Sequence, residues 1–167
     1  MKEVPVQPTA RCILTAVTQV DIPMLREILD DADTKRFLPE LCEEFQTKES
    51  LQQFIISFDN YLAHDEGILW GIRLHLNPTL IGFIAIMDMP DNPTLFYAMH
   101  PLSRSCGYMK ESLAAVIQNK QASGTCQTLQ TEVYNNNVIS TKLLIGLGCR
   151  IHKRDKRKIY YNLYGNK

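Results

Sequence analysis

The stretch "TLFYAMHPLSRSCGYMKESL", Thr94 to Leu113, decides the fold of this 167-residue chain. Its first part, Thr94 to Met99, is rich in strand-forming residues and ends at His100-Pro101, which predicts a strand followed by a loop. Apolar residues then recur at helical spacing, at Met109, Leu113, Val116 and Ile117. Ser123-Gly124 supplies a stop for this helix, so Gly107 stands where a helix begins.

The loop between this strand and this helix is a candidate anion-binding loop. The first turn of a helix has backbone N–H groups without intrahelical partners, and the helix dipole adds positive potential there. Gly107 has no Cβ, so a phosphate can approach its backbone closely. The alternative is an ordinary strand-to-helix turn in which Gly107 is needed only for its backbone freedom.

The length favours one domain over residues 1–167 with a single core, since a chain of this size needs neither disulfides nor a metal to fold. Eighteen basic residues balance eighteen acidic ones, so no overall field attracts nucleic acid or an anionic membrane, and neither partner is predicted.

The five cysteines, at positions 12, 42, 106, 126 and 149, form no C-x-x-C pair and have no histidine at zinc spacing. They predict reduced thiols and no metal site. No apolar stretch approaches the roughly 20 residues of a membrane span, and the first twelve residues lack the apolar core of a signal peptide. We therefore expect a cytoplasmic protein.

The N-terminal half predicts a strand, two helices and a hairpin. A strand begins at Arg11 and a helix at Asp21, with Leu25, Ile28 and Leu29 facing inward. A loop that contains the segment "RFLPELCEEF", 36–45, is expected next, after which Thr47 caps a helix with Leu51, Phe54, Ile55, Phe58 and Leu62 on one face. Period-two alternation over 68–76, a turn at Asn77-Pro78 and an apolar run from Leu80 predict two paired strands, the second central in a sheet.

The C-terminal part predicts strand, helix and hairpin. A strand covers Thr128 to Tyr134, and a helix capped by Asn137 and closed by Gly148 follows. Its inward residues are expected to be Ile139, Leu143, Leu144 and Leu147. A hairpin through 152–158 leads to the last strand. The class is α/β, in the order β-α-α-β-β-β-α-β-α-β-β, with a mixed sheet that is antiparallel at its start and helices on both faces.

Two motifs carry a resemblance to a known family. The loop Arg104-Ser105-Cys106-Gly107-Tyr108-Met109 resembles the Arg/Gln-x-x-Gly-x-Gly/Ala phosphate loop of the GNAT superfamily of N-acetyltransferases, with methionine at the last position. Its continuation through Glu111 and Leu113 is similar to the Gly-Tyr-x-x-Glu-Ala-Leu of the Rim-type branch, which includes ribosomal-protein N-terminal acetyltransferases.

The second motif follows at the expected separation. Asn137-Val138-Ile139-Ser140 and Leu147-Gly148-Cys149 are similar to the family's Asn-x-x-Ser and Leu-Gly-Phe. Cys149 replaces the phenylalanine, and Gly146 inside the helix costs about 1 kcal/mol relative to alanine. With Met109, these departures concern efficiency more than fold.

The resemblance implies acetyl-CoA as cosubstrate, with its pyrophosphate on the loop amides and its pantetheine arm along the strand that ends at Met99. The implied coenzyme-binding residues are Met99, Arg104, Ser105, Cys106, Gly107, Tyr108, Met109, Lys110 and Asn137. Arg104 and Lys110 are expected to add charge, although a loop arginine can also be simply solvated. Cys106 lies where a thiol pKa can fall, but we expect it to contribute its amide alone.

Catalytic residues are less sharply indicated. The resemblance makes Ser140 the candidate acid for the departing thiolate, and the alternative is a first-turn hydroxyl satisfied within its helix. Glu132 and Tyr97 are the candidate bases, although a strand glutamate is often just solvent-facing. An α-amine needs only weak assistance, whereas a lysine amine needs more.

The sequence predicts direct acetyl transfer to an amine in a ternary complex and leaves the acceptor open between a protein N-terminus and a small amine. The rival hypotheses are a coenzyme-binding sensor without turnover and a domain with no coenzyme site. The basic run 150–158 is interpreted as a solvated hairpin. Phe37-Leu38-Pro39 and Trp70 are candidates for the acceptor pocket or for the core. A monomer and a homodimer are both compatible.

Overall fold

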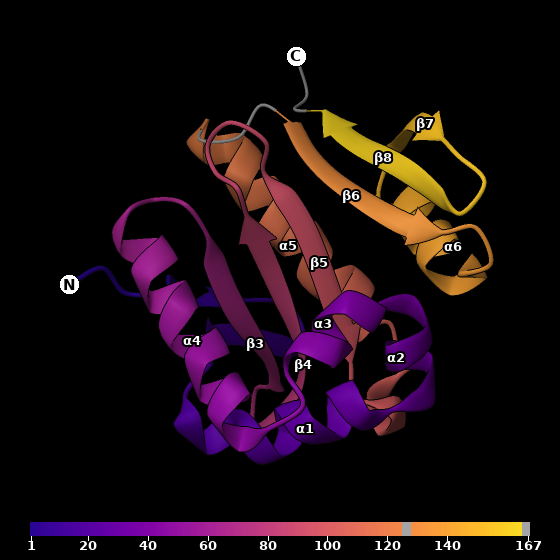
Figure 1. The fold of residues 1–167 in the computed structure, drawn as a ribbon. Coiled ribbons are helices and arrows are strands. Elements are labelled where there is room, and N and C mark those ends of the chain that lie inside the picture. The colour runs from indigo at the N-terminus through magenta and orange to yellow at the C-terminus, as the bar shows by residue number, and fades with distance from the viewer. Residues whose placement is uncertain (125–127, 165–167) are drawn as a thin grey trace.

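The computed structural model describes residues 1–124 and 128–164, which form one eight-stranded sheet with helices on both faces (Figure 1). The strands are β1 (Gln7–Pro8), β2 (Cys12–Ala16), β3 (Ile68–Leu74), β4 (Asn77–Met87), β5 (Thr94–Met99), β6 (Thr128–Tyr134), β7 (Arg150–Arg154) and β8 (Lys158–Tyr164). The helices are α1 (Ile22–Asp30), α2 (Ala32–Phe37), α3 (Pro39–Glu44), α4 (Lys48–Ala63), α5 (Tyr108–Ser123) and α6 (Val138–Gly146).

The strand order is β1-β2-β3-β4-β5-β6-β8-β7, and all neighbours are antiparallel except β5 and β6. The predicted class, mixed sheet and two helical layers are therefore confirmed. The apolar β4 lies inside the sheet and is buried from Leu80 to Ile86, because helices cover both of its faces.

Each face of the sheet has its own core. Leu25 of α1 and Phe54 of α4 pack on the face that carries Phe83, whereas Leu113 of α5 packs on the opposite face. Leu144 of α6 extends this second layer over β6 and β8. Figure 1 shows α1 to α4 in front of the sheet and α5 behind it. Among the described residues, no helix is long and apolar enough to cross a bilayer.

Three local predictions are wrong, and one short strand was not predicted. The segment expected to be a loop contains α2 and α3, because Asp31 accepts a hydrogen bond from Thr34 N at 3.1 Å and a proline begins the next helix. The turn between β3 and β4 lies at 75–76, before Asn77, and a two-residue strand, β1, precedes β2. Ile139 is 81% exposed and does not face the core.

The helix ends follow the predicted chemistry. Thr47 Oγ1 accepts from Ser50 N at 3.0 Å at the start of α4. After α6, Gly148 has φ +84°, and the N–H of Cys149 reaches back to Leu144 O at 3.0 Å, which closes the helix as expected. The cysteines at 12, 42, 106 and 149 are free thiols, and Cys126 lies outside the described residues.

Candidate active site

A cleft opens between the two parallel strands of the sheet, β5 and β6. The strands pair at their starts, where Thr94 lies opposite Gln130 and Thr131 Oγ1 donates to Leu95 O at 2.8 Å. Beyond this point they diverge, as Figure 1 shows. The space between them has a volume of about 570 Å³ and is also lined by α2, α3, the loop before α5, and α6. A cavity of this size is typical of small-molecule binding sites.

Main-chain groups of β5 face this cleft. His100 N donates to Ile81 O of β4 at 2.7 Å, so the N–H groups on that side of the strand bind β4. Because successive N–H groups alternate in direction along a strand, those of Tyr97 and Met99 point the other way, into the cleft. An extended ligand laid beside β5 would find these groups available.

The loop between β5 and α5 forms a concave set of donors at one end of the cleft. Ser105 and Gly107 adopt left-handed backbone conformations, with φ of +61° and +81°. Among the described residues, none accepts a hydrogen bond from the N–H groups of 105–110, and α5 begins within this segment. Successive free N–H groups at a helix start make an anion-binding site, which favours the phosphate-loop interpretation over an ordinary turn.

The side chain of Arg104 binds residues outside this set of N–H donors. Its guanidinium contacts Asp31 Oδ2 at 2.7 Å and Thr34 Oγ1 at 3.1 Å on α2, and its Nε donates to Met99 O at 3.2 Å. These contacts lower the pKa of Asp31 although burial of the carboxylate raises it. The positive charge of Arg104, which was expected to bind a phosphate, is therefore paired with Asp31 at the start of α2. Arg104 thus joins α2 to the end of β5.

The other loop residues are placed as follows. The cleft is lined by Ser105, Gly107, Tyr108, Met109 and Lys110. Cys106 is exposed and lies outside the lining, with Sγ 3.4 Å from Arg104 O. Lys110 extends toward α6, where a Cβ at Gly146 would lie 3.5 Å from its Nζ. The ammonium of Lys110 therefore lies beside α6, and its residue lines the cleft.

Two hydroxyl side chains meet across the cleft from different elements. Asn137 caps α6 by accepting from Ser140 N at 3.2 Å, which fixes Ser140 in the first turn. The hydroxyl of Ser140 faces Tyr97 of β5. The Oη atom of Tyr97 is buried and makes no hydrogen bond to any described residue. Burial raises the pKa of Tyr97 to about 12, although the nearby Ser140 hydroxyl opposes the shift. Tyr97 is therefore protonated at neutral pH.

Glu132 lies on the opposite wall and is paired with a lysine. Its Oε1 accepts from Lys158 Nζ at 2.6 Å, and Glu40 Oε1 lies 3.9 Å from the same ammonium. The ammonium also lies 5.0 Å from the centre of the Tyr134 ring, and Tyr134 Oη donates to Glu40 at 3.4 Å. Burial lowers the pKa of Lys158, but its bond to Glu132 and the charge of Glu40 outweigh this and raise it.

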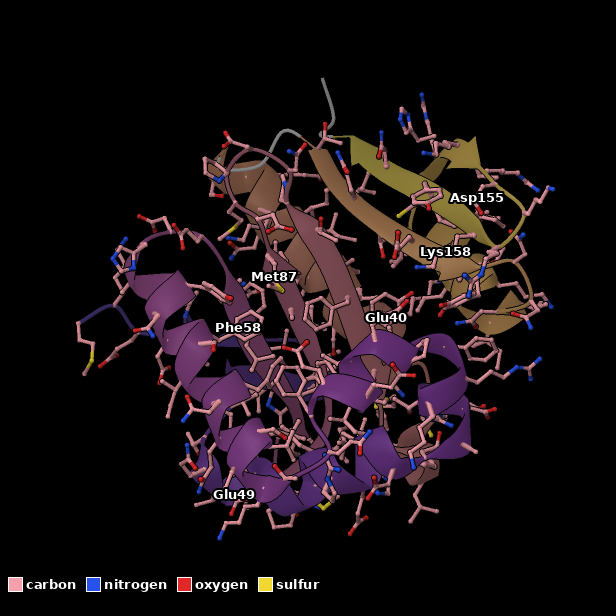
Figure 2. All side chains as sticks on the ribbon, viewed as in Figure 1. Glu40, Glu49, Phe58, Met87, Asp155 and Lys158 are labelled. Carbon is pink, nitrogen blue, oxygen red and sulfur yellow. The ribbon has the colours of Figure 1, made fainter. Side chains whose placement is uncertain are left out.

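Figure 2 shows Glu40 on α3 and Lys158 on β8 close to each other, and both line the cleft together with Glu132 and Tyr134. Lys158 is 19% exposed, so it does not belong to the solvated hairpin in which it was expected. Lys156 and Arg157 in the preceding turn are exposed, as predicted.

The profile of the acetyltransferase (GNAT) domain family matches residues 11–150. The chain belongs to the GNAT acetyltransferase family. A search of curated protein sequences finds no match.

Solved structures with this fold include other GNAT acetyltransferases. An acetyltransferase of this family from Bacillus anthracis has a TM-score of 0.82 and 15% identity, covering 98% of this chain and 100% of that one. RimL, a ribosomal L7/L12 α-N-protein acetyltransferase in complex with coenzyme A, has a TM-score of 0.83 and 12% identity, covering 98% of each chain. An acetyltransferase from Salmonella typhimurium that modifies the N-terminal serine of L7/L12 has a TM-score of 0.80 and 11% identity, covering 97% and 100%.

The structure of this GNAT domain also separates the candidate acceptor residues. Phe37 and Leu38 line the cleft. Trp70 is fully buried, and its indole Nε1 donates to Pro5 O at 3.0 Å, so it belongs to the core and not to a pocket. Pattern reasoning missed Glu40 because its segment was expected to be a loop.

Sequence reasoning also missed Arg11, whose guanidinium lies against the loop before α5. Arg11 directly precedes β2, far from the loop in sequence, and belongs to no recognised motif. The one available signal was its partner Glu111, which belongs to the Gly-Tyr-x-x-Glu similarity but had received no role.

Proposed function

We propose that this protein transfers an acetyl group from acetyl-CoA to an amine by direct transfer in a ternary complex. The observation that supports it most is the run of free N–H groups at 105–110, which lies at the end of a cleft walled by the open edge of β5. These features fit the coenzyme: the loop amides and Lys110 would hold the pyrophosphate, and the main chain at Tyr97 and Met99 would hold the pantetheine arm. Acetyl-CoA supplies the thioester as the activated acyl group.

Ser140 and Tyr97 are the proton donors in this proposal. The amine nitrogen bonds to the thioester carbonyl carbon, the carbon–sulfur bond breaks, and the departing thiolate takes a proton from the Ser140 hydroxyl. The buried phenol of Tyr97, which is protonated at neutral pH, can replace the proton that Ser140 gives up, and it takes a proton back from solvent when the products leave. Tyr97 is therefore a proton donor in this proposal and not a base.

Glu132 remains the candidate base, acting on the amine through water. Its side chain is 47% exposed at the cleft wall, where it can pass a proton to solvent. The ammonium of Lys158 binds the Glu132 carboxylate. A carboxylate held in this way suits an α-amine, which needs only weak assistance, better than it suits a lysine amine. The Glu132–Lys158 ion pair also favours the second candidate function, a coenzyme-binding protein without turnover. The reason is that Lys158 already binds the carboxylate that would have to act as the base.

The decisive experiment is incubation with acetyl-CoA and a panel of amines, with products identified by mass. The panel contains peptides with free α-amines, including ribosomal-protein N-termini, together with polyamines and amine-bearing small molecules. A mass increase of one acetyl group on an acceptor supports transfer. Coenzyme A binding in calorimetry without any acetylated product supports the second candidate, and the absence of both contradicts the coenzyme site.

A further inference from the structure

Glu111 in the first turn of α5 binds the segment that leads into β2. Its Oε2 accepts from the backbone N of Arg11 at 2.8 Å and of Cys12 at 3.2 Å, and from the Thr9 hydroxyl. Its Oε1 accepts from Arg11 Nε at 2.9 Å. One carboxylate therefore fixes both the main chain and the side chain of Arg11.

The guanidinium held in this way reaches the loop before α5. Arg11 Nη1 donates to Cys106 O at 2.8 Å, and the guanidinium carbon lies 4.6 Å from the centre of the Tyr108 ring. Arg11 Nη2 would lie 3.1 Å from a Cβ at Gly107. The fork of donors thus spans from Glu111 to the carbonyl group just before Gly107.

This contact sets the direction of the next N–H group. The peptide between Cys106 and Gly107 is trans, and in a trans peptide the C=O and N–H point in opposite directions. Since Arg11 binds the C=O on one side, the N–H of Gly107 points away from Arg11, and Gly107 itself lines the cleft. A reversed peptide would present a carbonyl oxygen to an anion in place of a donor.

We infer that Arg11, held by Glu111, is a positioning residue that orients the Cys106–Gly107 peptide so that its N–H donates to the coenzyme's pyrophosphate. The inference rests on the proposed function and extends it, because it assigns the anion selectivity of the loop to a residue 95 positions before Cys106 in the chain. It also gives the glutamate of the Gly-Tyr-x-x-Glu motif a role that requires no contact with the coenzyme.

The test compares two donors that differ in the pyrophosphate. Arg11→Met should raise the Kd of coenzyme A in calorimetry about tenfold and lower kcat/KM for acetyl-CoA by a similar factor, with kcat at saturation within twofold. With S-acetylpantetheine, which lacks the pyrophosphate, kcat/KM should change less than twofold. A purely structural defect would lower the activity with both donors equally, and that result would overturn the inference.

Arg11→Lys distinguishes orientation from charge. A lysine ammonium keeps the charge but has no planar fork that bonds Glu111 and Cys106 O together, so we expect a loss close to that of Arg11→Met. Parent affinity in Arg11→Lys would overturn the positioning role. Arg11→Gln replaces Arg11→Met in the comparison if the methionine variant does not fold.

Arg26 offers a matched control. It also joins a carboxylate, Asp30, to a loop carbonyl, Gln46 O at 2.8 Å, but these contacts do not involve the loop before α5. Arg26→Met should leave coenzyme affinity unchanged. Failure of the parent protein to bind coenzyme A would contradict the proposed function together with this inference, whereas parent binding with unchanged affinity in Arg11→Met would overturn the inference alone.

Discussion

Replacing Glu111 by glutamine should destabilise the protein by about 2 kcal/mol at pH 7. The side chain is 19% exposed. Burial raises the pKa of this carboxyl group, but the hydrogen bonds from Thr9 and Arg11 outweigh this effect and lower it from 4.5 to about 2. That difference corresponds to about 3 kcal/mol, which solvent screening at a partly open site reduces to about 2 kcal/mol.

The pH dependence follows from the direction of the shift. A carboxyl group whose folded-state pKa lies below its unfolded value stabilises the protein fully above about pH 5 and loses this effect as the pH falls toward 2. Protonated glutamic acid has nearly the same shape and hydrogen-bonding groups as glutamine. The difference between parent and Glu111→Gln should therefore shrink to less than half between pH 7 and pH 3.

Urea unfolding of both proteins at the two pH values measures this difference. Glu43→Gln is the control, because Glu43 is an exposed carboxylate on α3, and it should change the free energy of unfolding by less than about 0.5 kcal/mol at either pH. A Glu111→Gln effect that is equally large at pH 7 and pH 3 would refute the reasoning, because the loss would then not come from the ionised carboxylate.

Three further results are expected. Gly107→Val should abolish coenzyme A binding while the protein still folds, because valine disfavours a φ of +81° and its side chain blocks close approach of the pyrophosphate. Unchanged coenzyme A affinity in calorimetry would reject the phosphate-loop assignment. Ser140→Ala should lower turnover roughly tenfold to a hundredfold with nearly unchanged coenzyme affinity, and a rate within twofold of the parent would remove Ser140 from catalysis. Neutralising Lys156 and Arg157 should leave the Michaelis constants for the coenzyme and the acceptor within about threefold. Lys158→Met should instead lower the KM of a cationic amine about fivefold, because Glu132 and Glu40 lose the ammonium that pairs with them. Equal effects of the two changes would contradict the separate assignment of Lys158.

Features that depend on neighbours along the chain were predictable. The helix start at Gly107, the Asn137 cap and the strand from Lys158 to Tyr164 follow from turn chemistry and periodicity, which act over a few residues. The prediction was wrong for α2 and α3, because both helices are only six residues long and the apolar pattern is too short to indicate a period.

Part of the candidate site was likewise predictable from the sequence, and part of it was not. The motifs identify the loop at 104–110 and Ser140, but not the direction of the Arg104 side chain, which the structure turns toward Asp31. Asp21 shows the same limit: it precedes α1 as expected, yet its buried carboxylate binds Arg73 at 2.8 Å and Thr18 N, and does not cap the helix with its side chain. A residue type predicts which bonds a side chain can make, and the packed neighbours decide which of them it makes.

The sequence by itself determined the α/β class, most of the element order and the position of the glycine loop, because hydrophobic period, caps and turn residues are local properties. Only the tertiary structure decided that β5 and β6 diverge into a cleft, that Arg11 binds Cys106 across 95 positions of the chain, and that Lys158 lies between Glu132 and Glu40. Such contacts form between side chains that folding brings together from distant segments, and no pattern along the chain records their distance or direction.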